Sequence, residues 1–254
     1  MQKFLSDKTV LVTGAGRGLG AHIAQSFAEN GSKLALNYRN SRAQAEQFVQ
    51  NQNGRAGAFQ ADVRDALAVK KMVDAITPVL GSPDVVVHNA LTDFQFNGDA
   101  RSKMDQLTGD ELRAHFDTGP IALLNLVQAC LPGMKAKGGG QIIVIGTNLF
   151  QNPVVPYHDY TASKAALLSL VRTLCKELGQ HNITINMISG GLLRTTDASA
   201  ATPDEVFDFI AAQTPLGKVT TPQELADACL FFASPWARGV TGQNLIVDGG
   251  LTHA

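Results

Sequence analysis

The segment that most constrains the fold is residues 8–30, KTVLVTGAGRGLGAHIAQSFAEN. The β-branched and aliphatic run at 8–13 predicts a buried strand, and the apolar spacing over 18–30 predicts a helix that ends at Gly31. A strand, a glycine loop and a helix in immediate succession begin a βαβ unit. The glycines permit a tight turn and let backbone N–H groups approach a diphosphate at the helix N-terminus.

The same alternation of strands and helices continues along the whole chain. The strand patterns lack a clean alternation of apolar and polar residues, which is expected when helices cover both faces of a sheet. This predicts a single α/β domain over 1–254, a doubly wound parallel seven-stranded Rossmann sheet. The further strands are expected at 33–38, 55–62, 84–90, 141–147, 182–188 and 244–250, and the further helices at 41–52, 64–80, 110–136 and from about Tyr160 to Leu178.

Composition excludes several classes of protein. The 254 residues are 44% apolar and carry a net charge of −1, which gives no broad attraction to nucleic acid or to an anionic membrane. The N-terminus lacks the pattern of a signal peptide, and no apolar run reaches the ~18 residues of a membrane span. Cys130, Cys175 and Cys229 are far apart, which favours buried thiols in a reducing compartment over a metal or catalytic role. We expect a cytoplasmic protein without a metal site.

The glycine loop does not fit GxGxxG but fits TGxxxGxG, and nucleotide-binding residues are expected throughout it. An acid normally ends the second strand of NAD sites, yet this strand ends in Asn37-Tyr38-Arg39. Two guanidiniums, Arg39 and Arg17, suit the 2′-phosphate of NADP(H), unless Arg39 is a solvated loop charge. The residues expected to bind the nucleotide here are Thr13, Gly14, Gly16, Arg17, Gly18, Leu19, Gly20, Tyr38 and Arg39.

Two further pairs of residues follow strands of the predicted sheet. Asp62-Val63 ends the third strand and suits the adenine amino group, and Asn89-Ala90 ends the fourth and suits the adenosine ribose. Open α/β sheets bind ligands at the carboxyl ends of their strands. Taken alone, each pair is as consistent with an ordinary polar loop.

Tyr160 and Lys164 are four residues apart, so both side chains lie on one helix face. A phenol beside an ammonium group has the chemistry for proton transfer. The spacing also arises by chance, so the pair does not decide the function by itself.

Together, the motifs TGAGRGLG, DVRD, HNA, YTASK, INMISGG and TGQNLIVDGG resemble those of the short-chain dehydrogenases/reductases, in order and spacing. The resemblance covers essentially the whole chain and is nearest to 3-oxoacyl-acyl-carrier-protein reductases. It implies hydride transfer and a homotetramer. For pairing, the helix with Tyr160 offers a stripe of small residues, namely Ala162, Ala165, Ala166 and Ser169.

The resemblance assigns roles to individual residues. Tyr160 would donate a proton to a substrate carbonyl, with Lys164 lowering its pKa from ~10 and binding the nicotinamide ribose. Thr147 takes the place of the family's serine, 13 residues before Tyr160, unless it only caps its strand. The loop after the sixth strand would complete the cofactor site through Gly190, Leu192 and Thr195, and a substrate lid is expected at about 190–215.

The chain departs from the family pattern at three places. Gly119 replaces an asparagine that holds a proton relay, Leu91 replaces a glycine, and Gly190-Gly191 replaces Pro-Gly. The favoured hypothesis is an NADPH-dependent reductase of a 3-oxoacyl thioester or a related ketone. The alternative is a catalytically weak NADP(H)-binding protein with a structural or regulatory role. Epimerase chemistry is disfavoured, because it usually needs a larger C-terminal region.

Expected substrate contacts are apolar on the lid and basic at the entrance. Leu192, Leu193, Phe207 and Phe209 would supply lid contacts. Phe94 and Phe96 would form a pocket wall or a subunit contact. Arg172 and Lys176 would form a basic entrance for an acidic carrier, or they are ordinary solvated charges.

Overall fold

Seven parallel strands form the centre of the molecule, in the order β3-β2-β1-β4-β5-β6-β7. The computed structural model describes residues 4–6, 8–92, 96, 101–194 and 196–253. The strands are β1 (Thr9–Val12), β2 (Lys33–Tyr38), β3 (Ala56–Gln60), β4 (Val85–His88), β5 (Gly140–Thr147), β6 (Ile183–Gly190) and β7 (Asn244–Val247). The chain runs outward from β1 to β3 and then returns to β4, so a crevice opens where β1 and β4 end. The predicted sheet is confirmed.

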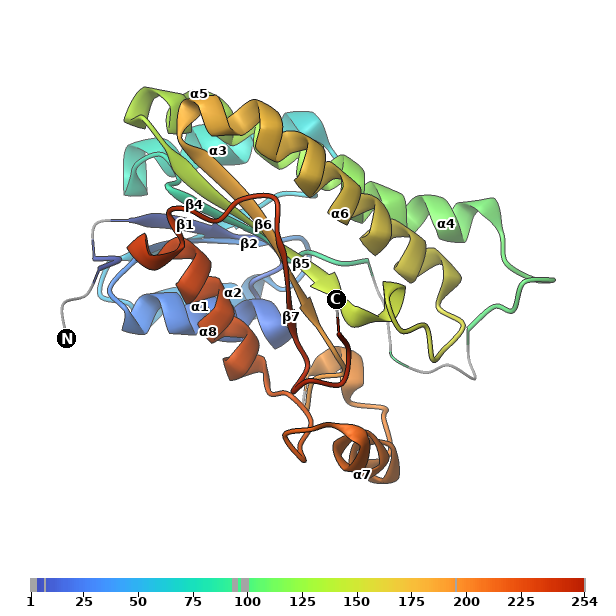
Figure 1. Ribbon diagram of the computed structural model, residues 1–254. Coiled ribbons are helices and arrows are strands. Elements are labelled where there is room, and N and C mark those ends of the chain that lie inside the picture. Colours follow the sequence, from blue (N-terminus) through green and yellow to red (C-terminus); the bar gives the residue numbers. More distant parts are fainter. Residues whose placement is uncertain (1–3, 7, 93–95, 97–100, 195, 254) are drawn as a thin grey trace.

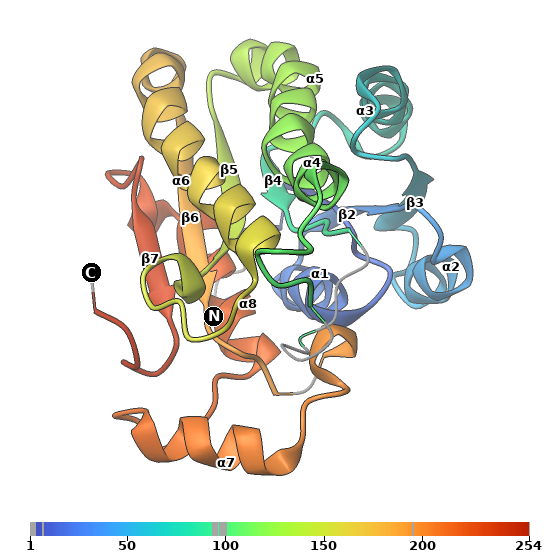
Figure 2. The ribbon, with the colours of Figure 1, turned by 90° about the vertical axis from the view of Figure 1, so that its right-hand side faces the viewer.

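Helices cover both faces of this sheet (Figure 1). One face carries α1 (Gly18–Glu29), α2 (Arg42–Gln50) and α8 (Pro222–Ala233), and the other α3 (Ala66–Leu80), α5 (Ala122–Lys137) and α6 (His158–Leu178). Two more helices, α4 (Gly109–Phe116) and α7 (Asp204–Gln213), lie beyond the carboxyl ends of the strands, α7 at the outer edge (Figure 2). The predicted lid segment contains α7.

The strands are apolar on both sides because the core is divided into two clusters. Leu11, Val86 and Val144 pack with α3, α5 and α6, whereas Val10 and Val87 pack with α1 and α8. Each cluster excludes water from one face of the sheet, which explains why the central strands β1 and β4 are buried along their whole length.

The cysteines are free thiols, and two of them lie in this core. Burial raises the pKa of Cys130 to about 12 and also raises the pKa of Cys229. Cys175 is partly exposed, so the expectation of three buried thiols is wrong for this residue. Among the described residues, no helix combines the length and the apolar character needed to cross a bilayer.

The helix expected over 110–136 is interrupted by a π-helical turn, Asp117–Ile121 (the π-turn), between α4 and α5. Pro120 lies inside this turn and lacks a backbone N–H, which breaks the regular hydrogen-bond ladder. Gly119, at its centre, lies against α6. A Cβ on Gly119 would stand 2.3 Å from Oγ of Ser163, which donates a hydrogen bond to the carbonyl of His115 at 2.7 Å. A larger residue at this position would therefore displace the Ser163 hydroxyl from its hydrogen bond.

We expect Gly119→Ala to lower the free energy of unfolding by about 1–3 kcal/mol, because the added methyl group overpacks the contact with Ser163. In the Ser163→Ala background the obstructing oxygen is gone, so the same change should cost much less. Chemical denaturation of the four proteins of this double-mutant cycle measures the coupling. Additive effects of the two substitutions would contradict the packing argument.

Candidate active site and nucleotide cleft

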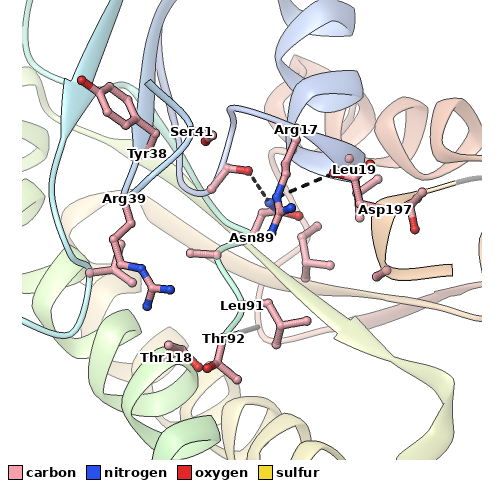
Figure 3. Close-up of a pocket in the computed structure, with 18 of the residues that line it drawn as sticks. Arg17, Leu19, Tyr38, Arg39, Ser41, Asn89, Leu91, Thr92, Thr118 and Asp197 are labelled. Carbon is pink, nitrogen blue, oxygen red and sulfur yellow. Dashed lines mark hydrogen bonds and ion pairs between the residues drawn. The ribbon is translucent and has the colours of Figure 1, made fainter. Parts of the chain in front are cut away.

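A cleft of about 910 Å³ opens at the carboxyl ends of β1, β2 and β4 and under the lid (Figure 3). It contains most residues that were expected to bind a nucleotide, together with the expected catalytic pair. From those predictions its wall includes Gly14, Arg17, Gly18, Leu19, Gly20, Tyr38, Arg39, Asp62, Val63, Asn89, Ala90, Gly190, Tyr160 and Lys164.

Some of the expected residues lie outside the wall. Thr13 is buried behind it, and its Oγ1 accepts hydrogen bonds from the backbone N–H groups of Asn89 and Ala90, both at 3.0 Å, which ties β1 to the loop after β4. Gly16 contributes through its lack of a side chain, since a Cβ there would stand 2.0 Å from Oγ of Ser41. Both residues shape the cleft rather than line it.

The loop after β6 differs from the prediction by one residue. Leu193 lines the cleft and Leu192 does not, because successive side chains of extended backbone point in opposite directions. Leu192 therefore stays a prediction, and Thr195 lies outside the described residues.

The glycine loop has the geometry of an anion cradle. Gly14 and Gly18 adopt positive φ angles of 63° and 55°, which favour glycine. A Cβ on Gly20 would stand 2.3 Å from the carbonyl oxygen of Gly14, so the first turn of α1 can lie close to the loop. In the described α1, no acid occupies the first turn and no side chain caps it. Its N–H groups and the positive end of the helix dipole thus favour a phosphate.

The end of β2 is basic and polar. Asn37 joins three strand ends, since its side chain accepts from the N–H of Gly14 at 3.3 Å and donates to the carbonyl of Ala61 at 3.0 Å. Arg39 lies on the side of Tyr38 in Figure 3, and Arg17 lies toward the lid residue Asp197. Nε of Arg17 is 3.6 Å from a carboxylate oxygen of Asp197, which links the glycine loop to the lid.

Asp62 ends β3 and is held by a neighbouring arginine. Arg64 donates from Nε to Oδ1 at 2.9 Å, and this hydrogen bonding is the main cause that lowers the pKa of the Asp62 carboxyl. The carboxylate therefore stays ionised, with its oxygens shared between Arg64 and any ligand in the cleft.

Tyr160 and Lys164 line the cleft, and Thr147 lies beside Tyr160 but is not part of the cleft wall. Tyr160 lies in the first turn of α6 and Lys164 one turn later, with the Lys164 Nζ 5.7 Å from the centre of the phenol ring. Thr147, the last residue of β5, forms a side-chain hydrogen bond with Tyr160. Nζ of Lys164 donates to the carbonyl of Ile145 at 2.6 Å. Tyr160 and Lys164 are only 5% and 6% exposed.

Burial controls the ionisation of this pair. It lowers the pKa of Lys164 to about 8 and raises the pKa of Tyr160 to about 12, with the hydrogen bond to Thr147 acting in the opposite direction. The expectation that Lys164 would lower the pKa of the phenol is therefore wrong, because loss of hydration outweighs the nearby ammonium. At neutral pH the phenol keeps its proton and can donate it.

Comparisons with known proteins agree with this geometry. The family model described as enoyl-(acyl carrier protein) reductase matches residues 14–252. The 7alpha-hydroxysteroid dehydrogenase of Escherichia coli (strain K12) is 31% identical over 248 residues, 97% of this chain and 94% of that protein. The 3-oxoacyl-acyl-carrier-protein reductase of Staphylococcus aureus (strain Mu50) is 32% identical over 248 residues, 96% and 98% of the two chains. The chain belongs to the short-chain dehydrogenase/reductase family.

Solved structures of similar proteins extend the likeness to the whole fold. A blue fluorescent protein from a metagenomic library, in complex with NADPH, has a TM-score of 0.88 and 32% identity, covering 98% of this chain and 100% of that one. A gluconate 5-dehydrogenase from Burkholderia cenocepacia J2315, in complex with NADP and tartrate, has a TM-score of 0.89 and 29% identity, covering 100% and 98%. This chain thus has the complete architecture of these short-chain dehydrogenases/reductases.

A charged cluster beside Tyr160 was not anticipated for this short-chain dehydrogenase/reductase. Asp159 is buried and forms an ion pair with Arg101, and Nε2 of His115 lies 3.4 Å from its carboxylate. The other carboxylate oxygen of Asp159 accepts a hydrogen bond from the backbone N–H of Tyr160 at 2.8 Å. The cluster ties the segment before α4 to the first turn of α6. Asp159 stands next to Tyr160 in the sequence and was therefore a visible candidate for an ion pair. Its partner, Arg101, could not be foreseen because it lies in a segment without helix or strand periodicity.

Aromatic rings also hold Tyr160 in place. Phe96 and His115 both meet its ring edge-on, at centroid distances of 6.0 Å and 5.9 Å. Phe96 also lines the cleft, as the prediction of a pocket wall requires, whereas Phe94 lies outside the described residues. The phenol hydroxyl is therefore directed by packing on its ring as well as by Thr147.

Other expected substrate contacts lie elsewhere. Phe209 is 66% exposed, and Phe207 is buried beneath the guanidinium of Arg194, so neither is part of the cleft wall. Arg172 and Lys176 belong to the far half of α6; twelve residues beyond Tyr160, Arg172 is about 18 Å away along the helix. The basic residue at the catalytic end of the cleft is Arg101 instead.

The strand end that carries Thr147 is anchored to the last residues of the chain. Nδ2 of Asn148, the next residue, donates to the Asp248 carboxylate at 2.9 Å and contacts the Thr252 hydroxyl at 3.3 Å. Gly191 lies in the same junction, since a Cβ there would stand 3.2 Å from the Asn148 amide. The ends of β5, β6 and β7 are therefore fixed together.

Proposed function

We propose that the protein is an NADPH-dependent oxidoreductase that reduces a carbonyl group to an alcohol. The observation that carries the proposal is that Tyr160, hydrogen-bonded to Thr147, and buried Lys164, one turn away, line the same cleft as the glycine loop. Two hydroxyls and an ammonium in a largely dry site suit the transfer of a proton to a carbonyl oxygen.

The cleft fits NADP(H) at three places. The glycine cradle suits the diphosphate, Asn89 and Asp62 line the part next to it, and Arg39 and Arg17 offer guanidiniums for a 2′-phosphate. No acid ends β2, which favours the phosphorylated nucleotide. Two similar structures hold NADPH and NADP, which supports the same choice here. When bound, NADPH would supply the hydride for the carbonyl carbon.

The side chains of this chain would then perform the acid–base part of the reaction. Thr147 and Tyr160 would bind the carbonyl oxygen through their hydroxyls, and Tyr160 would release its proton to that oxygen. The phenolate left behind would be stabilised by the Thr147 hydrogen bond and by the Lys164 ammonium. As the family resemblance implies, Lys164 would also bind the nicotinamide ribose.

We propose a 3-oxoacyl thioester or a related ketone as the substrate. The catalytic end of the cleft is lined by apolar Phe96, Leu91 and Leu193 and by polar Thr92 and Arg101. Such a wall suits a carbonyl compound with an apolar chain and one polar or acidic group. One similar protein is named a 3-oxoacyl-acyl-carrier-protein reductase, and another a hydroxysteroid dehydrogenase.

We expect Tyr160→Phe to lower kcat by roughly 10²–10⁴-fold, because the proton donor is lost. The affinity for NADPH should stay close to that of the unmodified protein. Stopped-flow oxidation of NADPH with a panel of 3-oxoacyl thioesters, diketones and hydroxysteroid-derived ketones measures the first quantity, and fluorescence titration the second.

Tyr157→Phe is the matched control, since Tyr157 is equally buried three residues earlier, and it should cost far less. An unchanged kcat in Tyr160→Phe would refute the mechanism. Tight NADPH binding without turnover on any member of the panel would favour the alternative of a catalytically weak binding protein.

We expect Arg39→Ser to lower the preference for NADPH over NADH, as the ratio of kcat/KM values, by roughly ten- to a hundredfold. A charged hydrogen bond of about 1.5–3 kcal/mol to the 2′-phosphate would be lost. The control is Arg113→Ser. Arg113 is an exposed arginine on α4 that pairs with Asp110, so its loss should leave the ratio unchanged. An unaltered ratio in Arg39→Ser, or a natural preference below about tenfold, would contradict the proposed specificity.

We further propose a cytoplasmic homotetramer, paired in part through α6. Ala162, Ala165 and Ser169 are exposed on one side of this helix, so the small-residue stripe is free of internal packing and permits close approach of a second helix. Light scattering should give a mass of four chains, about four times 26.9 kDa. A single-chain mass at micromolar concentration would exclude the tetramer.

A further inference from the structure

His88 is a buried histidine that the mechanism above does not use. It is the last residue of β4 and is 2% exposed. Since Val86, two residues before it, belongs to the core on the side of α3, α5 and α6, His88 points toward the same side. Its Nε2 lies 3.2 Å from the carbonyl oxygen of Gly119, at the centre of the π-turn.

The protonation state of His88 follows from its surroundings. Burial, helped by the ammonium of Lys164, lowers its pKa to about 3, so the ring is neutral at physiological pH. A carbonyl oxygen can only accept, which places the ring proton on Nε2. Nδ1 is then an acceptor, and it has no hydrogen-bond partner among the described residues. Of the two ring nitrogens, Nε2 is therefore the one that holds the ring in place.

The π-turn connects His88 to the catalytic helix. Gly119 lies directly against Ser163, whose hydroxyl donates to the carbonyl of His115 in the last turn of α4. Ser163 is next to Lys164 and less than one turn from Tyr160. The Cβ position of residue 119 faces Ser163, whereas the Gly119 carbonyl is hydrogen-bonded to His88 on β4, so the π-turn is held from both sides.

We propose that His88 is a positioning residue for Tyr160 and Lys164. Its Nε2–H fixes the Gly119 carbonyl, so that the π-turn supports α6 at Ser163, which lies between Tyr160 and Lys164. Gly119 has no side chain with which to make a polar contact. The hydrogen bond that holds this part of the π-turn comes instead from His88, on β4. The catalytic part of this inference rests on the proposed reductase function.

Two substitutions test the role in catalysis. His88→Leu removes both ring nitrogens at similar volume, and we expect kcat to fall roughly ten- to a hundredfold, with a small change in the KM for NADPH. His88→Gln keeps an N–H donor near the position of Nε2 and should recover much of the loss. A kcat in His88→Leu equal to that of the unmodified enzyme, or a Gln variant no better than Leu, would overturn the proposal.

A measurement without turnover tests the hydrogen bond itself. Nitrogen-15 spectra of the histidine rings should show His88, one of six histidines, as the neutral tautomer with its proton on Nε2 between about pH 5 and 8. The signal is assigned by its absence in His88→Gln. Titration in this range, or a proton on Nδ1, would overturn the proposal. Because NADPH oxidation is not needed, this outcome is distinguishable from failure of the proposed function.

Discussion

The arrangement of the active end depends on one buried ammonium group, that of Lys164. A buried charge is costly unless polar groups surround it, and here the carbonyl of Ile145 accepts directly from it. Its neighbours are neutral groups, the phenol of Tyr160 and the imidazole of His88, both kept neutral by burial. The nearby carboxylate of Asp159 is already paired with Arg101. The positive charge is therefore available to stabilise a phenolate.

Short-range patterns were enough to predict the fold and most of the nucleotide cleft. A glycine loop after a strand, and polar residues at strand ends, are set by covalent order, so the topology brings Gly14, Arg39 and Asn89 together. Features that depend on distant packing were missed or predicted wrongly. The direction of the Tyr160 pKa shift needs the extent of burial, and the partner of Asp159 comes from a segment without periodicity. Arg172 lies far from the cleft because α6 runs away from the cleft after Tyr160, and the direction of a helix relative to a cleft cannot be read from spacing along the sequence.

The replacement of the family's asparagine by Gly119 has a different meaning in three dimensions than in the sequence. In the sequence, Gly119 looks like the loss of a polar side chain. In the structure, the Ser163 hydroxyl occupies the space of that side chain, and the Gly119 carbonyl is hydrogen-bonded to His88. Residues 88, 119 and 163 thus fit one another as a set. The set holds the π-turn against α6 next to Tyr160 and Lys164.

The junction of Asn148 with Asp248 and Thr252 has a consequence for how the site responds to distant change. The residue that follows Thr147 is held by side chains about a hundred positions later in the sequence, in the segment after β7. Substitutions in that segment would therefore reach the end of β5 without altering any residue of the cleft wall.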